Sequence, residues 1–126
     1  MPSPGQKTDA MVETIDLFPT LCELTALPVP KETHGVSLKP ILNSPVATGR
    51  DAFSYQAAAS TLRTATHRFI LHRSGATELY ADQANSADEI ANLSSDQPKL
   101  VAELTKRLKK RMEIWRPIKQ NREPPR

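Results

Sequence analysis

The feature that most constrains the fold is a regular apolar stripe near the end of the sequence. From residue 100 onward, large apolar side chains recur every three or four positions, at Leu100, Val101, Leu104, Leu108, Met112 and Trp115. This spacing predicts a helix with one apolar face. We expect the helix to span residues 97–115, with Pro98 in its first turn and Asp96 as its cap. Such a face needs cover, so the rest of the chain must supply a second layer.

The middle of the sequence supplies a candidate for that layer. Apolar and polar residues alternate in four short runs, at 53–55, 61–64, 68–72 and 78–80. Alternation is typical of strands with one buried face. Thr66-His67 and Ser74-Gly75 are the turns that we expect between the later runs. The predicted fold class is therefore α+β, in which a helix and an extended connector precede a small antiparallel sheet of three to four strands covered by the C-terminal helix.

The first part of the sequence predicts a separate helical segment at about residues 14–26. Its apolar stripe consists of Ile15, Phe18, Leu21, Cys22 and Leu24. Pro19 fits a helix only in its first turn, where no N–H is needed. Leu27-Pro28-Val29-Pro30 should form an extended connector. His34-Gly35 then permits a turn, and Ser37 can cap a short helical turn over residues 37–42.

Charge is distributed unevenly along the sequence. Residues 1–105 hold 8 Lys or Arg and 12 Asp or Glu, whereas residues 106–126 hold 9 Lys or Arg and 2 Asp or Glu. A basic helix and tail can bind an anionic polymer, and the alternative is the solvated outer face of a packed helix. The few aromatic residues do not interleave with the basic ones, so we do not expect nucleic-acid binding. No apolar run approaches the length of a membrane span, so we expect no membrane partner.

Candidate reactive residues are few. A single cysteine, Cys22, lies on a predicted apolar helix face, where a small buried side chain is the expected role. Of the three histidines, His34, His67 and His72, the last two are five positions apart in a predicted strand and should point to opposite faces, which is unsuited to chelating one metal. The carboxylates Asp82, Asp88 and Glu89 lie in a polar loop without the spacing of a calcium loop. Asn92-Leu93-Ser94 matches a short glycosylation acceptor.

Several segments together resemble the sulfatase family, and most closely its bacterial branch similar to iduronate-2-sulfatase. The resemblance begins with the segment from Val12 to Leu24, which contains D-L-F-P-T-L, and continues in H-G-V-S-L-K-P-I-L from His34. It extends through the hairpin-like region 60–71, Glu78-Leu79-Tyr80 and Glu89-Ile90-Ala91-Asn92-Leu93. After Tyr80 the sequence has Ala81 where the family usually has Asp, and the following loop is one residue longer.

The resemblance implies a C-terminal portion of such an enzyme. Residues 1–50 would end the large α/β domain, residues 51–116 would form the C-terminal subdomain, and residues 117–126 would be a basic tail. The family's nucleophile lies in C/S-x-P-x-R, where it is oxidised to formylglycine beside calcium. Cys22 precedes Glu23-Leu24 and does not match that motif. We therefore expect no catalytic, cofactor-binding or metal residue here, and a packed large domain would be the partner.

Two functional hypotheses follow. The chain is the structural and substrate-rim part of a sulfuric ester hydrolase acting on sulfated sugars, inactive alone, or it is a stand-alone module that binds an anionic polymer through its basic helix. The first predicts an exposed apolar patch around Val12, Ile15, Phe18 and Leu21, with Arg63 or His67 as possible rim residues. The second predicts a well-covered first helix. Met1 to Gln6 carry no secretory signal pattern, although intact members of the family are typically periplasmic, secreted or lysosomal.

Overall fold

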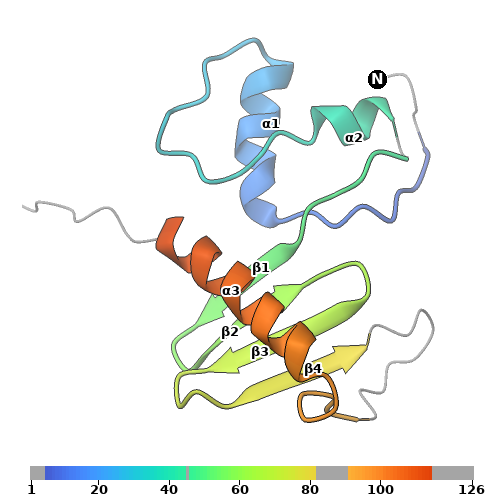
Figure 1. The fold of residues 1–126 in the computed structure, drawn as a ribbon. Coiled ribbons are helices and arrows are strands. Elements are labelled where there is room, and N and C mark those ends of the chain that lie inside the picture. The colour runs from blue at the N-terminus through green and yellow to red at the C-terminus, as the bar shows by residue number, and fades with distance from the viewer. Residues whose placement is uncertain (1–4, 45, 82–90, 115–126) are drawn as a thin grey trace, which may run out of the picture.

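The structure is a computed structural model that describes residues 5–44, 46–81 and 91–114 (Figure 1). Its helical and strand elements follow in the order η1 (Thr14–Asp16), α1 (Leu17–Leu24), α2 (Lys39–Asn43), β1 (Ala52–Gln56), β2 (Ala59–Arg63), β3 (His67–His72), β4 (Thr77–Ala81) and α3 (Pro98–Ile114). The predicted basic tail and Trp115 lie outside the described residues, as do Asp82, Asp88 and Glu89. No helix in the described ranges is long and apolar enough to cross a membrane.

The four strands form one antiparallel sheet in the order β1-β2-β3-β4. The strands follow one another along the chain, so each connection is a short hairpin. In the register, Phe53 faces Leu62, Leu62 faces Phe69, and Phe69 faces Leu79. One apolar row therefore runs across the whole sheet, as the alternation predicts.

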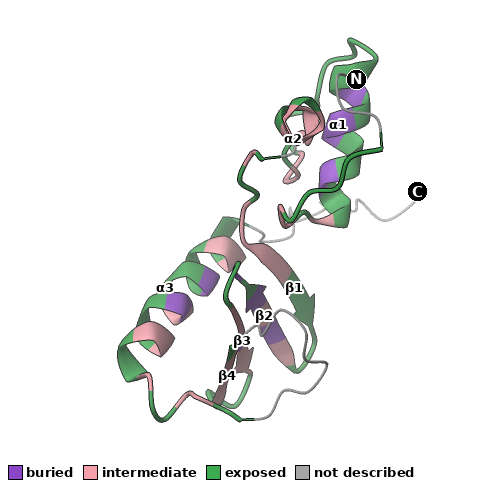
Figure 2. Ribbon diagram, turned by 90° about the vertical axis from the view of Figure 1, so that its right-hand side faces the viewer, coloured by how far each residue is buried: buried purple, intermediate pink, exposed green. Residues whose placement is uncertain are grey.

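Helix α3 covers the face of the sheet that carries this row (Figure 2). The buried core consists of Leu62, Phe69, Leu79, Leu104 and Leu108, each at most 3% exposed. The apolar stripe that predicts α3 is the same face that the sheet covers, so the α+β fold class is confirmed. The helix begins at Pro98, however, and Gln97 rather than Asp96 precedes it and accepts the Val101 N–H at 3.0 Å.

Of the two predicted hairpin turns, one is confirmed and the other lies one residue earlier than expected. Gly75 adopts a φ of 91°, a left-handed conformation that glycine tolerates, and it lies in the expected turn between β3 and β4. The predicted turn between β2 and β3, Thr66-His67, is wrong by one residue, because His67 is already the first residue of β3. Thr64 closes that turn: its N–H donates to the His67 carbonyl at 2.8 Å and its Oγ1 accepts the His67 N–H at 3.0 Å.

The first helical segment starts at residue 14, as predicted, but its first turn is 3-10 and α1 ends at Leu24. Pro19 lies in the first α-helical turn, where the prediction required it. Beyond the C-terminus, Ala26 adopts a φ of 56° and the Leu27 N–H donates to the Cys22 carbonyl at 2.8 Å. This is the geometry of a Schellman cap, with alanine where glycine is the usual residue.

The connector between α1 and α2 passes close to the start of the helical segment. The predicted turn at His34-Gly35 is wrong, because the turn occurs at residues 31–32. Gly35 instead permits a close approach: a Cβ there would lie 2.0 Å from the Ile15 carbonyl oxygen. Gly49 has the same role further on, where a Cβ would lie 2.4 Å from the Met11 carbonyl oxygen. The short helix α2 begins at Lys39, two residues later than predicted, and its N-cap is Leu38 rather than Ser37, although Ser37 Oγ accepts the Lys39 N–H at 3.2 Å.

The molecule therefore has two parts, the α1–α2 unit (residues 5–44) and the sheet–α3 unit (residues 52–114), joined by the linker 46–51 (Figure 1). The apolar core cluster contains residues of the sheet–α3 unit, among them Leu93 between β4 and α3, and no described residue before Phe53 contributes to it. The buried apolar core thus lies within the second unit.

Candidate functional site

Helix α1 is oriented with its large apolar side chains outward and Thr20 and Cys22 inward. These two residues, and Asp16 just before the helix, are at most 8% exposed. The four large apolar residues of α1, Leu17, Phe18, Leu21 and Leu24, are between 48% and 61% exposed and are called the docking face here. This is the reverse of the usual arrangement of a surface helix, whose apolar stripe faces the core.

The inward face of α1 is fixed by hydrogen bonds to the connector. Asp16 Oδ1 accepts the Val36 N–H at 2.8 Å, and Thr20 Oγ1 accepts the Leu38 N–H at 2.8 Å. The Thr20 hydroxyl in turn donates to the Asp16 carbonyl at 2.6 Å. Two buried polar side chains therefore satisfy the connector backbone, so that the α1–α2 unit is organised by directed hydrogen bonds.

The exposed apolar surface continues beyond the docking face. Val12 and Ile15, which precede α1, are 45% and 37% exposed, and Leu27, Val29 and Val36 of the connector are 61%, 42% and 54% exposed. The predicted exposed patch around Val12, Ile15, Phe18 and Leu21 is confirmed. Apolar surface of this kind, gathered on one short segment, is typical of a protein interaction site.

A charged cluster lies where the two units meet. Glu13 and Asp16, with side chains 7% and 1% exposed, both bind Arg50 Nη2 at 2.5 Å. Glu13 also accepts the Phe53 N–H at 2.9 Å and binds Arg111 Nη2 of α3 at 2.8 Å. One carboxylate thereby contacts the linker, the first strand and the last helix. We call Glu13, Asp16, Arg50 and Arg111 the charged cluster.

Within this cluster, the pKa of Asp16 lies below its ordinary value. Burial alone raises the pKa, but hydrogen bonds from the Val36 and Glu13 N–H groups and from Arg50 stabilise the anion and outweigh it. Asp16 Oδ2 accepts the Glu13 N–H at 2.9 Å. The Nε atoms of Arg50 and Arg111 are buried and have no partner among the described residues. Each guanidinium group is therefore held in place by its ion pairs with the carboxylates, although its Nε–H group makes no hydrogen bond to a described residue.

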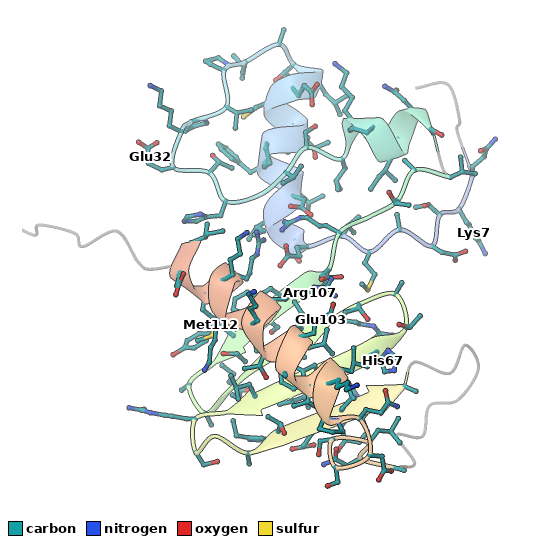
Figure 3. All side chains as sticks on the ribbon, in the orientation of Figure 1. Lys7, Glu32, His67, Glu103, Arg107 and Met112 are labelled. Carbon is teal, nitrogen blue, oxygen red and sulfur yellow. The ribbon has the colours of Figure 1, made fainter. Side chains whose placement is uncertain are left out.

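The predicted reactive residues are not brought together. Cys22 is 8% exposed, which confirms its prediction as a buried side chain. His67 lies on the sheet, away from α1 (Figure 3), and its Nδ1 is 2.9 Å from Thr66 Oγ1. His72 ends the same strand on the opposite face, as predicted. Among the described residues, no group of three or more His, Cys, Asp or Glu side chains could hold a metal ion.

The sheet face opposite α3 carries a polar row that the sequence did not reveal. Glu78 binds the His72 ring and accepts the Tyr80 hydroxyl at 2.5 Å, while the Arg68 guanidinium lies 5.9 Å from the Tyr80 ring centroid. The hydrogen bond from Tyr80, followed by that from His72, holds the pKa of Glu78 below its usual range. The same bond raises the pKa of Tyr80. Arg63 pairs with Arg68 across β2 and β3, on this same face.

The basic face of α3 is partly neutralised by the protein itself. Arg107 pairs with Asp51 of the linker and with Glu103 one turn earlier (Figure 3). Arg111 belongs to the charged cluster, whereas Lys106, Lys109 and Lys110 are exposed. Asn92, the glycosylation candidate, has a structural role: its Oδ1 accepts the Leu79 N–H of the edge strand and the Ser94 N–H, both at 3.0 Å.

The sequence matches the family described as "N-sulphoglucosamine sulphohydrolase, C-terminal" over residues 2–117. It is 26% identical over 125 residues to Arylsulfatase K of Xenopus laevis, covering 85% of this chain and 23% of that protein. A candidate sulfatase from Bacteroides thetaiotaomicron VPI-5482 has a similar structure, with 25% identity and a TM-score of 0.63 over 78% of this chain and 24% of the other.

A second structure, of the protein BT4656 in complex with its substrate D-glucosamine-2-N,6-O-disulfate, matches in fold at 21% identity. The TM-score is 0.67, over 86% of this chain and 25% of that chain. In every one of these comparisons the chain spans about a quarter of the length of its relative. The order of its elements, one helical segment followed by a four-stranded sheet under a helix, is thus a recurring part of larger sulfatases, and the chain belongs to the sulfatase C-terminal family.

Proposed function

We propose that this chain is the C-terminal part of a sulfatase acting on sulfated sugars, in which it has a structural and substrate-rim role without carrying the catalytic residues. The observation that carries the proposal is the outward orientation of the docking face. Fully burying a large apolar side chain stabilises a protein by roughly 1.5–3 kcal/mol. Because the four side chains of the docking face are about half exposed, covering them would contribute roughly 3–6 kcal/mol to association with a large domain.

The substrate class is proposed from the relatives. The family description names a sulphohydrolase of N-sulphoglucosamine, and BT4656 has a disulfated glucosamine as its substrate. The sequence resemblance favours an enzyme of the iduronate-2-sulfatase type within this class. Residues 1–50 would then complete the large domain and residues 51–116 would form the subdomain beside the substrate.

Calcium and formylglycine, which the family uses, do not fit the residues described here. Cys22 is buried and lies outside a C/S-x-P-x-R motif, and the described carboxylates and histidines do not form a metal-binding group. Both groups would be held by the large domain. We therefore derive no catalytic step from this chain.

The alternative hypothesis, a stand-alone module for an anionic polymer, requires a well-covered first helix and a free basic helix face. The exposed docking face and the pairing of Arg107 and Arg111 with Asp51 and Glu13 weigh against it. On α3, the four exposed lysines that would serve such a module are Lys99, Lys106, Lys109 and Lys110.

The experiment starts from the coding DNA upstream of this sequence, read for a C/S-x-P-x-R segment. That region and this chain are produced as separate polypeptides, mixed, and tested for co-elution and for hydrolysis of 4-nitrophenyl sulfate. We expect co-elution at equal stoichiometry, with hydrolysis by the mixture and none by this chain. Phe18→Ser should weaken co-elution, whereas Tyr55→Ser, an exposed aromatic on β1, is the matched control. Hydrolysis by this chain alone, or equal binding by both variants, would contradict the proposal.

A further inference from the structure

Among the described residues, the apolar core does not extend from one unit into the other. The core cluster ends at Phe53, and the described apolar residues of the α1–α2 unit take no part in it. Glu13 of the first unit makes polar contacts to the second. It accepts the Phe53 N–H at 2.9 Å and binds Arg111 Nη2 at 2.8 Å, across a separation of 98 positions in the sequence.

Glu13 is well suited to fix an orientation because its two oxygens have different partners. Oε1 accepts from β1, at the edge of the sheet, and Oε2 binds Arg111 in the last turns of α3. Contacts to two elements of the same unit restrict rotation as well as separation. Arg50, which binds both Glu13 and Asp16, ties the linker to the same point.

The low solvent exposure of Glu13 and Arg111 makes their ion pair depend on one orientation of the two units. The Glu13 side chain is 7% exposed and that of Arg111 is 21% exposed, so the pair lies largely out of water. A charge in such a place is costly unless its partner is present. Any other orientation of the two units would separate the pair, leaving the Arg111 guanidinium without its carboxylate and Glu13 with Arg50 alone.

We propose that Glu13 and Arg111 form a charged clamp that sets the orientation of the sheet–α3 unit relative to the α1–α2 unit. Both are positioning residues. If α1 docks on a large domain, which rests on the proposed function, the clamp also determines where the sheet lies relative to that domain. The orientation itself is a property of this chain and can be measured without the partner.

The test measures the distance between the two units by pulsed electron paramagnetic resonance. Spin labels are attached to Lys31→Cys in the connector and Ala76→Cys in the turn before β4, both exposed positions, in a Cys22→Ala background. Arg111→Met removes the charge and keeps the apolar stem, and Lys110→Met makes the same change at an exposed position of the same helix. We expect one narrow distance distribution for the parent and for Lys110→Met, and a broadened or shifted one for Arg111→Met. Arg111→Lys should restore most of the parent distribution.

Glu13→Gln removes the charge on the other side of the same ion pair, in the α1–α2 unit. It should broaden the distribution of spin-label distances in the same way. Circular dichroism checks that each variant keeps its helices, and the protection of β2 and β3 amides from hydrogen exchange checks the sheet. An unchanged distribution in folded Arg111→Met and Glu13→Gln overturns the clamp. This outcome is separate from the proposed function, since loss of co-elution with a large domain would leave the distance measurement unaffected.

Discussion

Replacing Asp16 with alanine should destabilise the α1–α2 unit more than any other single change at its polar face. The carboxylate is 1% exposed and accepts three hydrogen bonds, from the Val36 N–H, the Glu13 N–H and Arg50. Hydrogen bonds to a charged group contribute about 1.5–3 kcal/mol each and are not additive. Removing one partner of a buried ion pair costs about 3–5 kcal/mol. We expect the free energy of unfolding of this unit to fall by about 3–5 kcal/mol.

Hydrogen exchange followed by mass spectrometry resolves the unit that is affected. Protection of the amides of α1 and of Val36 should fall in Asp16→Ala, while protection of β2 and β3 should change little. Asp96→Ala, at an exposed aspartate before α3, is the control and should change stability by no more than about 0.5 kcal/mol. A loss below about 1 kcal/mol in Asp16→Ala would refute the reasoning, because the three bonds could not then have the assigned role.

The same carboxylate predicts a pH dependence. Its pKa is lowered in the folded state, so the folded protein binds the proton less readily than the unfolded chain. The stabilisation is therefore fully present above the ordinary aspartate pKa of 3.8, and is lost as the pH falls through the lower folded pKa. Amide protection of α1 should decline over that acidic range in the parent, and Asp16→Ala should lack this part of the decline.

Three further changes test other parts of the structure. Leu104→Ala, at a position 1% exposed, should lower the free energy of unfolding of the sheet–α3 unit by about 2–5 kcal/mol in urea, and a loss under about 1 kcal/mol would mean that α3 does not cover the core. Ala26→Gly relieves a φ of 56° and should raise the thermal midpoint of the α1–α2 unit, whereas a decrease would exclude the cap geometry. Glu78→Gln should lower the pKa of Tyr80 toward 10.0 in an ultraviolet titration; an unchanged titration would contradict the hydrogen bond.

The sheet and α3 could be predicted because each carries its own local signal. The stripe from Leu100 to Met112 has the helical period, and the strands alternate about a single apolar row. The two surfaces cover each other within the chain, so local pattern and tertiary packing agree. Where a short polar turn decided the boundary, as at His67, the pattern was accurate only to one residue, because hydrogen bonds of Thr64 define the turn.

The first helix shows what periodicity leaves out. The sequence groups Cys22 with Phe18, Leu21 and Leu24, but the structure buries Cys22 and exposes the other three. A stripe reveals which residues are apolar, and it carries no information on whether their cover belongs to the same chain. The burial of Asp16 and Thr20 had no local signal either, since the connector groups that they bind lie about twenty positions away.

The charged cluster could not be predicted from the sequence either. Glu13 and Asp16 stand at a helix start, where acidic residues are common for reasons that require no burial. Arg50 lies in a loop and Arg111 in a basic run that reads as a solvated face. Only the folded chain shows that Arg107 pairs with Asp51 and Arg111 with Glu13. These ion pairs reduce the basic surface of α3 that is left for an anionic polymer.

The inward polar face and the outward apolar face of α1 are parts of one arrangement. Because Asp16 and Thr20 hold the connector through its backbone, the α1–α2 unit keeps its shape without an apolar core of its own. Its large apolar side chains remain available to a partner, and Glu13 joins that unit to α3 by an ion pair and to β1 by a hydrogen bond. A unit built in this way gains stability when its apolar face is covered, since burial adds to hydrogen bonds that are already formed. Docking should therefore protect α1 amides first and β2 amides least, because the sheet is already covered by α3.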